Sequence, residues 1–137
     1  MKMSRTVSYA VNAMVTLART QNHVPIPCRR LAAEGEMPER FLLQILRNLV
    51  THGILRSTRG VDGGYMLIRS PEDVSLLELI EAIEGPIESP LPAVENMPKE
   101  SQKAIREALA SINDTTRSQL ESIKLAHLLP PPSPNGN

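Results

Sequence analysis

Three arginines and three glycines lie close together in the segment RSTRGVDGGYMLIR, which runs from Arg56 to Arg69. Such a loop could cradle a phosphate group, or it could turn a β-hairpin. The phosphate motifs require either a Lys-Ser or Lys-Thr pair after the last glycine or a GxGxxG run that opens a helix. Here the glycines precede Tyr-Met-Leu-Ile, which is typical of a β-strand. The segment therefore predicts a hairpin with Asp62-Gly63 in its turn and a bulge or another strained position at Gly64.

A second polar group, Arg40, Gln44 and Arg47, recurs at the i, i+4 and i+7 spacing of one helix face. Arginine forms bidentate hydrogen bonds with guanine and glutamine with adenine, and each such pair contributes about 1–3 kcal/mol of discrimination between bases. The same side chains would also suit an ordinary solvated helix face. Leu43 projects toward that side too. It could contact a thymine methyl group, contact a neighbouring element, or simply be an unburied leucine.

No residues are spaced for catalysis or for metal binding. The one cysteine, Cys28, excludes an internal disulfide and the ligand spacings of zinc and iron–sulfur sites. Because Cys28 stands at an apolar helix position, we favour a small core residue over a redox-active thiol. The histidines are far apart in the sequence: His23, His52 and His127. The acids between residues 75 and 85 resemble a solvated helix face: Glu78, Glu81 and Glu84. We expect no enzyme activity, no metal and no cofactor.

The composition indicates a single domain with an aliphatic core. Only 2% of the 137 residues are aromatic, with one Phe and no Trp, which suits helix packing better than a β-sandwich. The sequence has neither a secretion-type leader nor an uninterrupted apolar run near 18 residues. We therefore expect a cytoplasmic protein without a membrane partner.

The charge is unevenly distributed although the formal net charge is zero. Residues 1–70 carry ten Lys or Arg against four Asp or Glu, a net +6, and the remainder carries a net −6. A division of this size suggests that the N-terminal half meets a polyanion. Two ordinary solvated faces would give the same division, so charge alone leaves both interpretations open.

The spacing of apolar residues predicts helices interrupted by the hairpin. The N-terminal part is predicted to hold helices over 4–21 (capped by Ser4), 28–34 and 38–53, followed by the hairpin over 54–68. After it come a helix over 75–85 (capped by Ser75), an irregular Pro-rich loop over 86–98, a helix over 99–128 and a disordered tail over 129–137. The helix over 38–53 buries five apolar residues: Phe41, Leu42, Ile45, Leu46 and Leu49. The helix over 99–128 carries a helix–helix seam: Ile105, Leu109, Ile112, Thr116, Leu120 and Ile123.

Three helices followed by a two-stranded hairpin is the element order of a winged helix-turn-helix. We therefore expect a mainly α fold with a small β-hairpin wing and a long C-terminal helix. In that arrangement the third helix enters the major groove, and the wing lies against the DNA backbone or the minor groove. Arg59, next to Gly60, is the expected minor-groove residue. Arg56 and Arg69 lie nearer the stem and contact phosphate or solvent. The glycines serve the turn and the close approach of the wing to DNA.

These residues carry a resemblance to the IscR- and NsrR-type (Rrf-type) family of winged-helix transcription regulators. The matching stretches are MKMSRTVSYAV, LAAEGEMPERFLLQILRNLVTHGILRSTRGVDGGYML and VSLLELIEAIEGP, which together cover residues 1–86. The resemblance implies a homodimer on double-stranded operator DNA, usually a partly palindromic site. It implies further that the long C-terminal helix forms the dimer interface and that the N-terminal helix contacts the DNA backbone.

From the residues and the resemblance together we predict two sets of contacts. The DNA-binding residues are Ser4, Arg5, Tyr9, Arg29, Pro38, Glu39, Arg40, Gln44, Arg47, Arg56, Arg59, Gly60, Gly63 and Gly64. The dimer-interface residues are those of the seam: Ile105, Leu109, Ile112, Thr116, Leu120 and Ile123. The expected divisions are a DNA-binding domain over 1–85, an effector-type loop over 86–98, a dimerisation helix over 99–128 and the tail over 129–137.

The sequence departs from the family pattern in the loop after Glu84-Gly85-Pro86. Cluster-binding members of the family place three cysteines there, whereas residues 87–102 contain none. Since thiolates hold iron–sulfur clusters, the chain more closely resembles the cluster-free members. We therefore expect a repressor that answers to a small-molecule or protein effector. The alternative is a winged-helix interaction module that no longer binds an operator.

Overall fold

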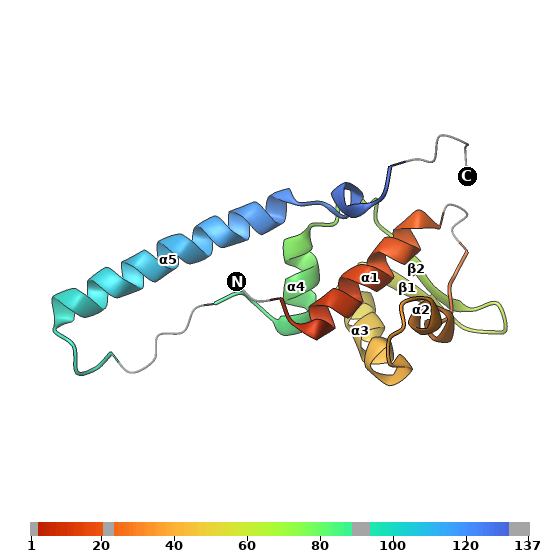
Figure 1. Cartoon of the computed structure of the whole chain (residues 1–137), viewed down its shortest axis with the longest axis horizontal. Helices are drawn as coiled ribbons and strands as arrows, with labels where there is room; N and C mark the ends of the chain where they lie inside the picture. The colour runs from red at the N-terminus through yellow and green to blue at the C-terminus, as the bar shows by residue number, and fades with distance from the viewer. Residues whose placement is uncertain (1–2, 21–23, 89–93, 132–137) are drawn as a thin grey trace.

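The computed structural model describes residues 3–20, 24–88 and 94–131. In chain order its elements are α1 (Arg5–Arg19), α2 (Cys28–Glu34), α3 (Glu39–Thr51), β1 (Leu55–Thr58), β2 (Gly64–Leu67), α4 (Leu76–Glu84), α5 (Lys99–Ser122) and the 3₁₀ helix η1 (Leu125–Leu128). Figure 1 shows α1–α4 gathered at one end of the molecule with the β1–β2 wing beside them. The predicted fold class is confirmed: mainly helical, with one antiparallel hairpin and a long C-terminal helix.

Helices α1–α4 form a common core because each of them has an apolar face. Two serines define helix starts as N-caps: the Ser4 Oγ accepts a hydrogen bond from the Val7 N–H at 3.2 Å, and the Ser75 Oγ accepts one from the Glu78 N–H at 3.0 Å. Helix α3 packs against α1, α2, α4 and β1, so it is held from several sides. The residues that anchor it are all buried: Leu42, Ile45, Leu46 and Leu49.

The wing differs in detail from the predicted hairpin. Thr58 pairs with Gly64, so residues 59–63 form the turn, and the positive φ angles belong to Gly60 (+111°) and Gly64 (+153°) rather than to Asp62. Of the two alternatives for Gly64, a strained position is correct and a bulge is wrong, because the residue stays in register. Gly63 is buried, and a Cβ there would stand 2.2 Å from the Thr58 carbonyl oxygen.

Gly64 also lets the wing approach the chain before α2. A Cβ at this position would lie 2.4 Å from the carbonyl carbon of Ile26. The next residue, Tyr65, exchanges two backbone hydrogen bonds with Ile26, both 2.9 Å long. Because this bridge extends the hairpin by a third short segment, the wing is fixed to the core rather than projecting freely.

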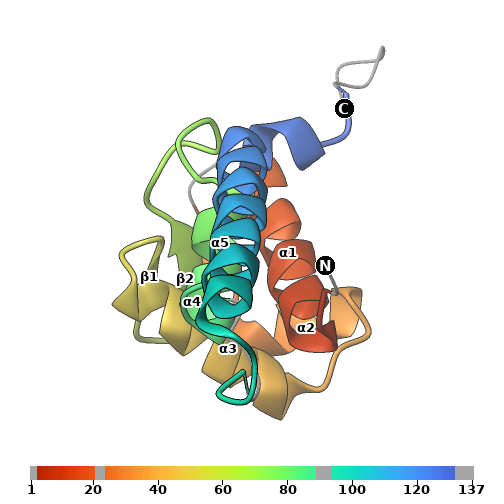
Figure 2. The same cartoon turned by 90° about the vertical axis from the view of Figure 1, so that its left-hand side faces the viewer.

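The C-terminal helix is shorter than predicted. Helix α5 ends at Ser122, and Ile123 has an extended backbone, so the predicted helix to residue 128 is wrong in its last turn and a half. The extended segment lets the Leu125 N–H donate to the Val74 carbonyl at 2.8 Å and buries the Leu125 side chain. Most of α5 extends away from the other helices in Figure 1, and Figure 2 looks along it.

Three further expectations meet different outcomes. Phe41 is 64% exposed, so its predicted burial is wrong, because it lies on the flank of α3 rather than on the face centred on Leu42, Ile45 and Leu46. The Pro-rich loop falls partly outside the described residues (89–93), as does most of the tail (132–137). Within the described part of the chain, no helix is long and apolar enough to span a membrane.

Candidate nucleic-acid interface

Helix α3 presents a continuous polar face away from the core. Arg40, Gln44 and Arg47 are all exposed, as the spacing predicted, while the opposite face is buried. The Gln44 Nε2 donates to the Asn48 Oδ1 at 3.3 Å, so the amide lies along the helix. Leu43 is half-buried, so it is not a fully exposed leucine, and its contact with a thymine methyl or a neighbouring element stays a prediction.

The start of α3 is fixed by its junction with α2. Pro38 is the N-cap, and the Met37 N–H donates to the Ala32 carbonyl at 2.8 Å, which closes the turn between the two helices. Glu39, the first residue of α3, and Arg29, the second residue of α2, are both predicted DNA contacts and are both exposed. Residues that begin a recognition helix are the ones that reach base edges in helix-turn-helix proteins.

Cys28, the first residue of α2, contacts the first residue of α3. The thiol is half-buried against the core and donates to the Glu39 carbonyl over 3.7 Å. Burial, and then the negative charge of Glu39, raise the pKa of the Cys28 thiol. Because a raised pKa lowers the thiolate fraction, the site suits a packing residue, as predicted, better than a reactive thiol.

The wing stands next to α3. Burial raises the pKa of the Tyr65 hydroxyl and the neighbouring Cys28 adds to this effect, whereas the positive charge of Arg47 opposes it. Arg47 of α3 therefore lies close enough to β2 to act on Tyr65. Arg59 and Gly60 are exposed in the turn of the wing, and a Cβ on Gly60 would meet nothing within 4 Å.

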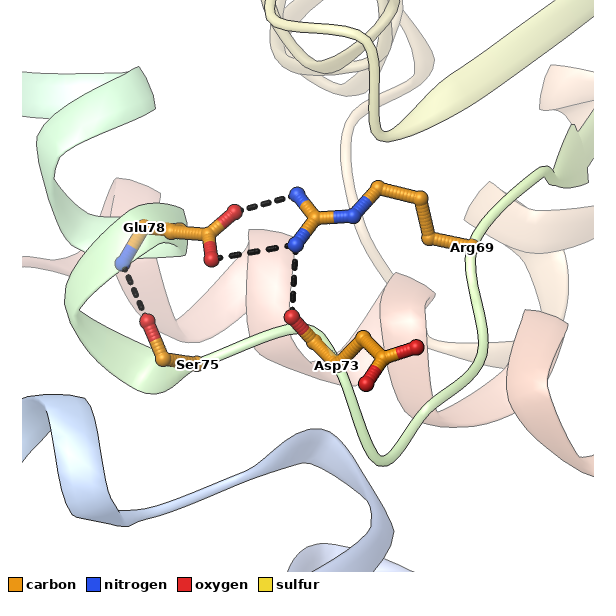
Figure 3. Close-up of polar contacts among 4 residues, drawn as sticks. All are labelled: Arg69, Asp73, Ser75 and Glu78. Carbon is orange, nitrogen blue, oxygen red and sulfur yellow. Dashed lines mark hydrogen bonds and ion pairs between the residues drawn. The ribbon is translucent and has the colours of Figure 1, made fainter.

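Arg69 has a structural role that the sequence analysis missed. Both of its terminal nitrogens donate to the Glu78 carboxylate, and Nη2 also donates to the Asp73 carbonyl at 2.6 Å (Figure 3). The hydrogen bonds to Glu78 raise the pKa of Arg69, burial opposes this effect, and the negative charges of Glu78 and Asp73 add to it. The Arg69 guanidinium joins the end of the wing to the start of α4. Its side chain is still 34% exposed, so the expected contact with solvent remains, and contact with phosphate stays a prediction.

Arg56 lies on the far side of the wing stem from Tyr65. Its side chain is exposed and, opposite Met66, lines a cavity of ≈ 510 Å³ beside the C-terminal end of α1. Ser4 is occupied as the N-cap of α1, Arg5 is exposed, and Tyr9 is half-buried against the core. For these four residues, as for the other predicted DNA-binding residues, contact with DNA stays a prediction.

The arginines thus divide into two classes. Among the described residues, carboxylates pair with Arg30, Arg69 and Arg117. No ion pair within that same part of the chain involves the three arginines of α3 and the wing tip: Arg40, Arg47 and Arg59. The arginines of α3 and the wing turn are therefore exposed and lie outside the ion pairs of the described residues.

A second polar junction joins α4 to α5. The Glu81 carboxylate pairs with Arg117 and accepts a hydrogen bond from the Ile87 N–H at 2.9 Å. Burial opposes ionisation of Glu81, but the hydrogen bonds from Arg117 and Ile87 outweigh it and lower the pKa of the carboxyl. The predicted solvated face is wrong for Glu81, whose side chain is 23% exposed, whereas Glu78 is paired with Arg69 but stays 40% exposed. Sequence reasoning missed both partners because Arg69 and Arg117 lie 9 and 36 residues away.

The predicted seam of α5 is partly covered within the chain. Leu120 is buried, and Ile112 is 60% exposed. Three of the other positions are half-buried in the helix: Ile105, Leu109 and Thr116. Ile123, the sixth, is the residue that ends α5.

Comparisons with known proteins agree with this fold. A stretch of 89 residues, 65% of the chain, is 40% identical to Rv1287 of Mycobacterium tuberculosis and spans 55% of that protein. The HTH-type transcriptional regulator CymR of Bacillus subtilis is 30% identical over 93% of this chain and 89% of its own length. The solved structure of that protein, titled the global cysteine regulator, superposes with a TM-score of 0.76 over 93% of this chain and 95% of that one.

A more distant neighbour is IscR of T. potens, which is 27% identical with a TM-score of 0.70 over 93% of this chain and 85% of that one. A family model described as "Iron-dependent Transcriptional regulator" matches residues 3–131, nearly the whole chain. The chain therefore belongs to the Rrf2 family, whose members are transcriptional regulators rather than enzymes.

Proposed function

We propose that this chain represses transcription by binding, as a homodimer, to a partly palindromic operator. The observation that carries the proposal is the open face of α3, where Arg40, Gln44 and Arg47 are exposed while the other face is fixed in the core. A helix held in this way can enter the major groove, which is wide enough to admit it. Arginine and glutamine then read guanine and adenine through paired hydrogen bonds.

The wing supplies a second contact to the same DNA. Tyr65 and Ile26 fix its stem to the core, while Arg59 at the turn is exposed and lies outside the ion pairs of the described residues. A minor groove that is narrow and rich in A·T concentrates negative potential and attracts an inserted arginine. We place Arg59 there, with the backbone of Gly60 leaving room for its approach.

A second copy of the chain would cover α5. Much of this helix lies away from the rest of the molecule in Figure 1, and its main neighbour within the chain is α4. Exposed helices of this length gain most of their stability from packing of an apolar face. The row through Ile105, Leu109 and Ile112 provides such a face, and a two-fold dimer would place two α3 helices on two half-sites.

We propose further that the signal reaches the chain through the loop over 86–98, and that no iron–sulfur cluster carries it. The family description names iron, yet the donor set does not fit, because residues 87–102 contain no cysteine and Cys28 lies in α2. Among the described residues, no group of three His, Cys, Asp or Glu could hold a metal ion. At the start of the loop, the Ile87 N–H donates a hydrogen bond to the Glu81 carboxylate, which in turn forms an ion pair with Arg117 of α5. A small-molecule or protein effector that moves this loop would therefore act on the dimer helix.

Selection of bound fragments from genomic DNA, followed by a salt titration of operator affinity, tests the proposal. With several phosphate contacts, log K should fall linearly with log salt concentration, by about 0.9 for each contact. Arg40→Ala should lower the affinity and reduce this slope. Arg19→Ala is the matched control, because Arg19 is an exposed arginine at the C-terminal end of α1, and it should change neither quantity.

Failure to bind any genomic fragment at low salt would contradict operator binding. It would support instead an interaction module that works through α5 and the acidic half of the chain.

The visible spectrum of the protein purified without oxygen separately tests the proposal that no iron–sulfur cluster carries the signal. A sulfur-to-iron charge-transfer band would contradict a cluster-free regulator.

A further inference from the structure

Phe41 is the single aromatic side chain of α3, and it is 64% exposed. An isolated exposed apolar residue is common on protein surfaces and by itself indicates nothing. The position of Phe41 distinguishes it, because it lies in the first turn of the helix that we place in the major groove. It is next to Arg40 and three residues before Gln44, both of which are exposed.

The neighbours of Phe41 form a row along one side of α3. Residues three or four apart on a helix share a face, so Phe41, Gln44 and Asn48 follow one another along it. The hydrogen bond from Gln44 to Asn48, 3.3 Å long, aligns the Gln44 amide with this row. A helical side chain leans toward the N-terminus, which directs the Phe41 ring toward the end of the helix that reaches the bases.

Of the four bases, only thymine presents an apolar group in the major groove, its 5-methyl group. Arg40 and Gln44 supply hydrogen-bonding groups, whereas the phenyl ring of Phe41 supplies only an apolar surface. Leu43, the other apolar candidate on this helix, is half-buried and therefore less available. The base-facing side of α3 thus pairs one apolar contact with two polar ones.

We propose that Phe41 packs against the 5-methyl group of a thymine next to the base pair read by Gln44, and so determines part of the operator sequence. This inference rests on the proposed function. It predicts a thymine at one fixed position of each half-site, selected by its methyl group rather than by a hydrogen bond.

Replacement of thymine by deoxyuridine tests the contact, because it removes the methyl group and keeps the base pairing. The full chain first selects its operator from a random DNA pool, and each half-site thymine is then replaced in turn. For the wild type, one replacement per half-site should weaken binding by about fourfold, the effect expected for one buried methyl or methylene group. For Phe41→Ala the same replacement should have no further effect.

Phe41→Leu is the matched variant, since it keeps an apolar surface and should retain most of the deoxyuridine sensitivity. Thermal unfolding should give nearly the same midpoint for Phe41→Ala as for the wild type, because the ring is exposed. Equal affinity of the wild type for every substituted operator would overturn the inference, and so would sensitivity that persists in Phe41→Ala. Both results leave operator binding intact, whereas failure to select any DNA would overturn the proposed function itself.

Discussion

Single arginines in this molecule have opposite roles according to whether a carboxylate faces them. The Arg69 guanidinium donates hydrogen bonds to the Glu78 carboxylate and the Asp73 carbonyl, and it thereby fixes the connection between the wing and α4 (Figure 3). Arg59, ten residues earlier, is exposed in the wing turn. The sequence alone could not separate them, because both are arginines of the same hairpin and the partner of Arg69 comes from the next helix.

The first prediction concerns Arg59. Arg59→Ala should weaken operator binding by roughly tenfold or more, because a charged hydrogen bond contributes about 1.5–3 kcal/mol. The melting temperature should not change, since the side chain is exposed. Fluorescence anisotropy with a labelled operator measures the affinity, and Arg19→Ala is the control variant. Unchanged affinity of the Arg59 variant would remove this residue from the interface.

The second prediction separates two glycines of the same wing. Gly64→Ala combines a φ of +153° with a Cβ placed 2.4 Å from the Ile26 backbone, so it should destabilise the fold by more than about 2 kcal/mol. Gly60→Ala meets only the backbone penalty, about 1 kcal/mol, because the space around it is open. Urea unfolding measures both. Equal losses would show that the approach to Ile26 does not constrain the wing.

At the scale of helices and strands, the sequence predicted what depends on local pattern. The helices of the core follow from apolar periodicity, and Ser4 and Ser75 were identifiable as caps because serine accepts a backbone hydrogen bond there. The end of α5 was missed because burial of Leu125 under the core, a long-range contact, decides it. Phe41 was misplaced for a related reason, since it lies at the margin of the apolar stripe and its burial depends on the neighbouring elements.

The third prediction concerns the junction of α4, α5 and the loop. The pKa of Glu81 is lowered in the fold, so its ionised form contributes stability that is present above the unfolded pKa, about 4.3. That contribution is lost as the pH falls through the folded pKa. Glu81→Gln should therefore be less stable than the wild type near pH 7, and the difference should shrink on acidification.

Urea unfolding at a series of pH values between 7 and 3 measures this difference. Glu84→Gln, on the exposed side of the same helix, is the matched control. A difference between wild type and Glu81→Gln that stays constant over the whole range would show that the Glu81 carboxylate contributes as a hydrogen-bond acceptor and not through its charge.

At the scale of the whole molecule, the proposed dimer on DNA explains both the division of charge and the projecting helix α5. The N-terminal half carries the positive excess and contains α3 and the wing, while the acidic half contains α4 and the projecting helix α5. A single copy would leave the apolar row of α5 partly exposed to water, with Ile112 the most exposed of its residues. It would also bind only one half-site of the proposed palindromic operator. A dimer binds more tightly, because once one subunit is bound the second is held close to its own half-site.

The fourth prediction tests this explanation through α5. Ile112 is 60% exposed in the single chain, so Ile112→Glu should leave the fold intact but place a charge in an apolar interface, which disfavours association. Sedimentation should show the wild type as a dimer and this variant as a monomer. Ser111→Glu adds the same charge at the neighbouring exposed position and should remain dimeric if it lies outside the interface. Because Ile112→Glu no longer dimerises, its affinity for the operator should also fall, although no proposed DNA contact has changed. A variant that stays dimeric, or a wild type that is monomeric while bound to its operator, would contradict the two-copy arrangement.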